Sequence, residues 1–158
     1  MNIKIKLWVY LILILLPGFS FADDSDGDRL KNYQIAVGSQ HTCALDDNDV
    51  QCWGRNVYGQ STVPTGLMNP VAVAAGHFHT CALDDNGVQC WGRDVYGQST
   101  VPSLLNPTAV AAGYFHTCAL DDNGLQCWGD NNYEQSTVPV GLVNPIAVAA
   151  GDAHTCAL

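Results

Sequence analysis

The chain has 158 residues, with 15 Asp or Glu against 6 Lys or Arg, so its formal net charge is −9. Only 13% of the residues are charged and 47% are hydrophobic, which excludes a disordered acidic tail. Binding to a nucleic-acid backbone needs clustered Lys and Arg, so this composition also argues against nucleic acid as a partner.

Residues 1–22 have the layout of a secretory signal peptide. Two lysines give a basic start, residues 7–16 form an uncharged apolar run, and Ser20 and Ala22 place small residues before a cut after Ala22. The run is shorter than the roughly 20 residues of a membrane-spanning helix, and no later segment is long and apolar enough to span. We therefore expect a secreted or periplasmic protein with no membrane attachment after cleavage. An uncleaved anchor is the alternative.

Residues 23–34 are expected to form a linker. Alternate aspartates begin at Asp24, as in a calcium loop, but the glycine is misplaced for an EF-hand. Ile35 stands where a bidentate Glu would be required. We expect no metal here.

Residues 35–158 consist of copies of one unit. The units span residues 38–75, 76–112, 113–150 and an incomplete 151–158, so the period is 37–38 residues. Each begins Gly-x-x-His-Thr-Cys-Ala-Leu-Asp-Asp-Asn and continues through Gln-Cys-Trp-Gly and Gln-Ser-Thr-Val-Pro to Asn-Pro and Ala-Val-Ala-Ala. Such a period indicates stacked or circular repeats.

Each unit predicts β-strands and turns, hence an all-β protein. In the second unit, residues 79–83 and 88–92 flank Asp-Asp-Asn-Gly, whose residues tolerate the backbone angles of a hairpin turn. Symmetric pairing about this turn places Cys81 opposite Cys90 and Leu83 opposite Val88. Because strand side chains alternate, both faces of the sheet carry apolar groups. The sheets are therefore expected to stack face to face around an axis.

The unit resembles the repeat of the regulator of chromosome condensation family. The positions that carry the resemblance in the second unit are Gly76, His79, Ala82, Leu83, Gly87, Val88, Trp91, Gly92, Gly97 and Gln98. The resemblance implies a β-propeller, commonly of about seven blades, with one four-stranded blade per repeat. The short, exported form is similar to bacterial secreted members, among them an inhibitor of β-lactamase. The cysteine pairs depart from the family pattern, and so does Glu134, which replaces the glycine before Gln in the third unit.

Three complete units and the start of a fourth predict a partial propeller. Closed propellers have about four to eight blades, so these units cannot close a ring. Cys156 has no second cysteine nine residues further on, unlike its counterparts in the earlier units. We therefore expect a truncated sequence with an unpaired Cys156. Self-association through the unclosed blades or through this thiol is the alternative.

The remaining cysteines are expected to form one disulfide inside each blade. The predicted pairs are Cys43–Cys52, Cys81–Cys90 and Cys118–Cys127. Opposed strand residues have Cα atoms about 4.5–5.5 Å apart, which suits a disulfide, and export lets the bond persist. The rival is a metal site that uses a histidine with both cysteines, but it lacks a fourth ligand and the usual zinc spacing. We expect no metal and no cofactor.

The repeated histidines and tryptophans are interpreted as structural. They are His41, His79, His116 and His154, with Trp53, Trp91 and Trp128. The histidines are expected to bond to backbone between blades, and the tryptophans to pack there. A catalytic histidine needs an orienting acid and a nucleophile in one cleft, whereas each unit offers only aspartates at the far end of its hairpin. The sequence therefore predicts no enzyme.

Differences between the copies mark candidate binding loops. The variable stretches follow the first glycine of each unit and the Trp-Gly pair. From these stretches we select the aromatic and arginine residues, because such residues are favoured interface anchors. The candidates are Phe78, Tyr114, Phe115, Arg55, Arg93, Tyr58 and Tyr96, with Tyr133 in the corresponding loop of the third unit. The alternative is that these aromatics only cover the blade edges.

The sequence thus predicts a secreted, non-enzymatic propeller protein that binds an unidentified partner protein through its loops. One alternative is guanine-nucleotide exchange, as in the nuclear relatives, although the sequence shows no inserted wedge loop. A hydrolase would need an acid and a nucleophile outside the repeat. A truncated copy without function is the last alternative.

Overall fold

The computed structural model describes residues 33–46 and 49–158. The predicted signal peptide, residues 1–22, and most of the predicted linker, residues 23–34, lie outside the described residues. Gln34, which we assigned to the linker, is the first residue of a strand. In the described ranges every regular element is a β-strand, and no helix there is long and apolar enough to cross a membrane.

The strands follow one another in the order that the repeat predicts. They are β1 Gln34–Val37, β2 His41–Leu45, β3 Val50–Gly54, β4 Ala72–Ala75, β5 His79–Asp84, β6 Gly87–Gly92, β7 Ala109–Ala112, β8 His116–Asp121, β9 Gly124–Gly129, β10 Val148–Ala150 and β11 Thr155–Ala157.

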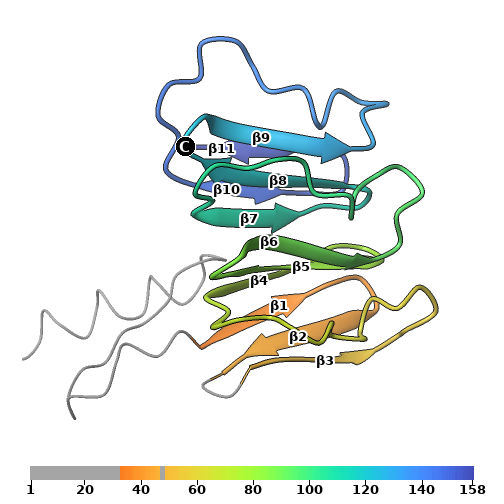
Figure 1. Ribbon diagram of the computed structural model, residues 1–158. Coiled ribbons are helices and arrows are strands. Elements are labelled where there is room, and N and C mark those ends of the chain that lie inside the picture. The colour runs from red at the N-terminus through yellow and green to blue at the C-terminus, as the bar shows by residue number, and fades with distance from the viewer. Residues whose placement is uncertain (1–32, 47–48) are drawn as a thin grey trace, which may run out of the picture.

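The strands form antiparallel sheets stacked on one another (Figure 1). Three sheets have three strands each, in the orders β1-β2-β3, β4-β5-β6 and β7-β8-β9, and β10-β11 forms a fourth, two-stranded sheet. The first strands of successive sheets lie beside one another, β1 next to β4, β4 next to β7, and β7 next to β10. This stacking buries both faces of the inner sheets, as the apolar residues on both faces predicted.

Each complete sheet has three strands. The prediction of four strands per blade, which the family resemblance implied, is therefore wrong for the described residues. The segment after the third strand forms turns instead of a ladder. In the second unit, the amide of Gly97 donates to the carbonyl of Asp94 and the amide of Thr100 donates to the carbonyl of Gly97. The Ser99 amide donates to the Asp94 carboxylate. These amides are therefore not available to a fourth strand.

The hairpins have the predicted register, and a disulfide crosses each complete one. Cys81 pairs with Cys90, and Leu83 pairs with Val88. All three predicted disulfides are formed, each with its Cα atoms 4.1 Å apart. Each closes a short loop, which the chain-entropy description values at roughly 2–3 kcal/mol. Cys156 is a free, exposed thiol.

The core lies between consecutive sheets. Between the first two sheets, Cys43, Leu45 and Val50 pack with Val73 and Ala82. The largest fully buried side chains are nevertheless polar, namely His79, His116, Gln60, Gln98, Thr80 and Thr117. A buried polar group without a partner costs about 1–3 kcal/mol. Each of these side chains makes at least one hydrogen bond, although the Nε2 atoms of the two glutamines and the Nδ1 atoms of the two histidines have no partner among the described residues.

Two kinds of glycine serve the repeat. A Cβ atom at Gly76 would overlap the carbonyl oxygen of Gly113 and the ring of His79, so only glycine lets successive sheets come this close. Gly97 instead has φ +80°, with nothing within 4 Å of a Cβ atom. In the third unit Glu134 occupies that position with φ 62°. The unusual residue there is tolerated because its side chain has room.

We predict opposite consequences for these two positions. Gly76→Ala should lower the free energy of unfolding by about 2–3 kcal/mol, because the added methyl meets backbone and a buried ring. Gly97→Glu should cost only about 1 kcal/mol, and Glu134→Gly should gain a similar amount, since the backbone conformation is the sole difficulty. Urea unfolding of the three variants measures these values. A Gly76→Ala variant no less stable than Gly97→Glu would contradict the close packing.

Candidate functional site

The frame of the site is a hydrogen-bonded chain between sheets. The Nε2 atom of His79 lies 2.8 Å from the hydroxyl of Thr117 in the next sheet, and that hydroxyl donates to the carbonyl of Gln98 at 2.8 Å. Because the single hydroxyl proton is directed to the carbonyl, Nε2 has to be the donor to Thr117. The same arrangement joins His41 to Thr80 and His116 to Thr155.

This chain corrects the expectation for the histidines. Their ring partner in the next sheet is a threonine hydroxyl, and backbone is reached only through it. The ring of His154 is exposed and has no threonine partner among the described residues. Burial lowers the pKa of His79 to about 4, and burial also lowers the pKa of His41 and of His116. The inner histidines are therefore neutral at neutral pH.

The tryptophans join the same chain. The indole of Trp128 donates to the carbonyl of Gln98 at 3.0 Å, and Trp91 donates to the carbonyl of Gln60 at 3.0 Å. Both therefore connect neighbouring sheets by a hydrogen bond. Trp53 is 55% exposed, so the packing between blades expected of it is wrong for the described residues. It belongs to the first described sheet, which has a neighbour on one side only.

The glutamine of each unit also fixes a candidate loop. The side chain of Gln98 is fully buried, and its Oε1 atom accepts from the amide of Tyr96 at 2.9 Å. Gln60 holds Tyr58 in the same way at 2.9 Å. The loop tyrosines are thus attached to the buried frame through the residue that receives the inter-sheet hydrogen bonds.

The two kinds of variable loop meet at one edge of the stack. The amide of Arg93, after the third strand, donates to the carbonyl of Phe78, before the second strand. Seven of the eight candidate residues gather there together with one further residue, and Tyr133 is the candidate left out. We call this group the aromatic–arginine surface: Arg55, Tyr58, His77, Phe78, Arg93, Tyr96, Tyr114 and Phe115.

Ring contacts cross from unit to unit within this surface. Tyr58 meets Phe78 of the next unit edge-on at 5.3 Å, and Tyr96 meets Phe115 of the following unit at 4.9 Å. Both separations fall in the range in which aromatic pairs attract each other. Within the third unit, Tyr114 meets Phe115 edge-on at 4.2 Å. The rings therefore form one ordered cluster over several blades.

Arg93 lies at the centre of the cluster. Its guanidinium carbon is 4.9 Å from the ring centre of Phe115, 5.1 Å from that of Tyr58 and 5.4 Å from that of Phe78. The guanidinium of Arg55 is 5.9 Å from the Phe78 ring. All four distances lie within the range of cation–π attraction. Residues 33–46 and 49–158 contain no other Lys or Arg.

His77 is the member that the sequence analysis did not select. Its ring stacks on Tyr114 at 3.7 Å, and its Nδ1 atom lies 2.5 Å from the hydroxyl of Ser39. Burial lowers its pKa, which Asp152 raises and Arg93 and Arg55 lower. It occupies the same position after the unit glycine as Tyr114, and this correspondence could have identified it. Ser39, His77, Tyr114 and Asp152 line a hollow of about 250 Å³.

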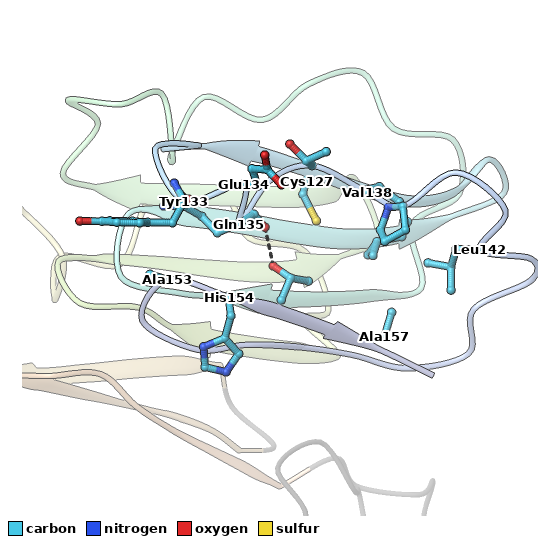
Figure 2. Close-up of a pocket in the computed structure, with 13 residues that line it drawn as sticks. Cys127, Tyr133, Glu134, Gln135, Val138, Leu142, Ala153, His154 and Ala157 are labelled. Atoms are coloured by element: carbon cyan, nitrogen blue, oxygen red, sulfur yellow. Dashed lines mark hydrogen bonds between the residues drawn. The ribbon is translucent and has the colours of Figure 1, made fainter.

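The surface ends at the third unit. Tyr133 is 76% exposed, because Ala153 stands where the second and third units have Phe78 and Phe115. Asp130 stands where the first and second units have arginine. Figure 2 shows Tyr133 and Ala153 at one end of a pocket of about 270 Å³. Val138 lines this pocket, and its counterpart in the first unit packs in the same core cluster as Trp91.

The opposite edge of the stack is acidic. The turns of the second and third hairpins expose Asp85 and Asp122, whose carboxylates accept from Asn69 at 2.6 Å and from Asn106 at 2.7 Å. The two loop edges therefore differ in charge. Within the described ranges, no three His, Cys, Asp or Glu side chains gather as a metal site would require.

These features define a repeat protein of the β-propeller type. The chain belongs to the regulator of chromosome condensation (RCC1) repeat family, whose family model matches residues 33–60, 71–98 and 108–135. No curated protein sequence matches the chain significantly. The family match rests on repeats that the described structure shows to be equivalent sheets.

Solved structures agree with this assignment. The crinkly WD40 ectodomain of the Arabidopsis thaliana receptor kinase ACR4 is 29% identical, with a TM-score of 0.63 over 83% of this chain and 46% of its own. The Physcomitrella patens receptor kinase CR4 ectodomain is 30% identical, with a TM-score of 0.61 over 78% and 34%. Human WBSCR16 shares the fold at 22% identity, with a TM-score of 0.71 over 81% and 45%. The chain thus spans less than half the length of these relatives.

The neutral buried histidine makes stability depend on pH. The pKa of His79 is about 4 in the folded chain, below the ordinary 6.5, so the unfolded chain binds the proton more tightly. The stabilisation is complete above pH 6.5 and should be lost as the pH falls toward 4, by about 3 kcal/mol for this residue. Urea unfolding across this range measures the loss. A His79→Gln variant should be less stable than the parent at neutral pH, and its free energy of unfolding should fall less as the pH is lowered. If the free energy of unfolding had the same pH dependence in both proteins, the assignment of the effect to His79 would be contradicted.

Proposed function

We propose that this chain is a secreted, non-enzymatic interaction module that binds a partner protein through the aromatic–arginine surface. The observation that carries the proposal is the gathering of seven of the eight candidate residues, from separate loops, into one cluster on a hydrogen-bonded frame. The RCC1 repeat fold itself favours an interaction module.

The chemistry of the surface supports protein binding. Tyrosine, phenylalanine and arginine are the residue types enriched where protein interfaces contribute most affinity. Tyr58 and Tyr96 keep 42% and 43% of their surface exposed, so they present ring area to a partner. Their amides are already held by buried glutamines, which lowers the entropy lost on binding. Covering the blade edges and binding a partner are therefore compatible roles.

The disulfides support secretion. Cys43, Cys81 and Cys118 are fully buried, and bonds of this kind persist in oxidising compartments outside the cytosol. The proposed signal peptide, cut after Ala22, is the matching export signal. The non-enzymatic role is supported by the commitment of the inner histidines to the inter-sheet hydrogen bonds.

We predict that binding of the partner depends on Tyr96 and not on Tyr133, its counterpart in the third unit. The immobilised chain should capture a partner from the medium of its own cells, and Tyr96→Ala should weaken that capture by about tenfold, because it removes an exposed ring from the cluster. Tyr133→Ala is the matched control, since Tyr133 occupies the same repeat position without a ring contact in the cluster. Equal capture by both variants would refute binding through this surface.

Secretion is tested by the intact mass of the exported protein. We expect a chain that begins at Asp23 and is lighter than its reduced form by six hydrogens, two for each of the three disulfides. Alkylation without reductant should modify one thiol, Cys156. A product that retains Met1 would overturn the proposed cleavage, and alkylation of the paired cysteines in the native protein would overturn the disulfides.

A further inference from the structure

We propose that the aromatic–arginine surface recognises the carboxylate side chains of an acidic segment on its partner protein, with Arg93 as the central anchor and Arg55 beside it. This inference rests on the proposed function and names the chemistry of the partner. Its evidence is the environment of the two arginines and the charge of the surrounding loops.

The aromatic rings hold a cation that the chain itself supplies. Three rings surround the guanidinium of Arg93 at 4.9–5.4 Å, so their faces are not free for an ammonium group from a partner. A guanidinium fixed in this way keeps a planar set of N–H donors in one orientation. Such a fork matches the two oxygens of a carboxylate.

No acidic side chain of the described residues neutralises these arginines. Neither Arg55 nor Arg93 forms an ion pair there, and the buried Nε atom of Arg93 has no hydrogen-bond partner. The carboxylate of Asp94, the residue after Arg93, is already engaged, because it accepts from Ser99 and from both the amide and the hydroxyl of Thr100. A partly buried charged donor gains by meeting an acceptor, and the described residues offer none to the Nε atom of Arg93.

The remaining charge directs an acidic segment to this edge. The described residues contain ten Asp and Glu side chains and only these two arginines. In the third unit Asp130 replaces the arginine and Glu134 is exposed, so this side of the surface repels carboxylates. An acidic segment is therefore expected over the loops of the first two units, where both arginines meet Phe78.

The test compares two labelled peptides on the exported, disulfide-bonded chain. One repeats Glu-Glu-Phe and the other repeats Gln-Gln-Phe, so they differ only in carboxylates against amides. Fluorescence anisotropy should show the Glu peptide binding about tenfold more tightly. Arg93→Gln should remove this preference. Arg93→Lys should lose most of it, because lysine keeps the charge without the planar fork.

Two further variants separate recognition from folding and from net charge. Arg55 is exposed and carries no buried contact, so Arg55→Gln leaves the frame intact and should reduce the preference by about threefold. Ser103→Asp changes the net charge by the same amount at the opposite edge, where Ser103 is exposed, and should leave the preference unchanged. An equal effect of Ser103→Asp would show that only net charge matters and would overturn the inference.

The outcomes distinguish this inference from the proposed function. If both peptides bind equally and Tyr96→Ala weakens both, the surface binds protein but carboxylate recognition is wrong. Absence of binding by either peptide also overturns the inference, while the capture experiment tests the proposed function independently. If the chain self-associates and Arg93→Gln abolishes that association, the surface binds the acidic turns of a second copy. This result would overturn the inference of an acidic segment on a different partner protein.

Discussion

The structure depends on the hydrogen-bonded chain that runs from a histidine to a threonine hydroxyl of the next sheet and from there back to a glutamine carbonyl of the histidine's own unit. It requires glycine at the start of each unit, because His79 and the backbone of the next sheet occupy the space beside Gly76. Burial also keeps the imidazole neutral by lowering the pKa of His79, so that the unpartnered Nδ1 atom carries no hydrogen. The shared residues of the repeat are therefore explained by packing and hydrogen bonding between sheets.

The same chain positions the variable loops. Gln98 receives Thr117 and Trp128 at its carbonyl, and its side chain receives the amide of Tyr96. One residue thus joins the buried frame to the exposed surface. Successive frames stack in the same way, so the tyrosine of one unit reaches the phenylalanine of the next. Convergence of the loops is a consequence of the stacking distance.

Part of this could be predicted from the sequence. The hairpin register and the cysteine pairs follow from a symmetric turn and the two-residue period of a strand, which are local properties. The hydrogen bond from His79 to Thr117 could not be predicted, because Thr117 lies on the next sheet. The repeat pattern does not determine how far apart successive sheets lie or how they are offset. The enclosure of Arg93 and the inclusion of His77 depend on the same distance. The fourth strand was wrong because the resemblance could not show that Asp94 caps its own turn.

The differences between units, rather than their common residues, determine where the surface begins and ends. Replacement of phenylalanine by Ala153 leaves Tyr133 without a ring to meet, and replacement of arginine by Asp130 reverses the local charge. Neither change touches the inter-sheet hydrogen bonds, since Thr155 still donates to the carbonyl of Gln135 at 2.7 Å (Figure 2). The frame tolerates such changes because its hydrogen bonds involve other positions. Binding chemistry and stability are therefore carried by separate residues of one repeat, and each unit can alter the first without losing the second.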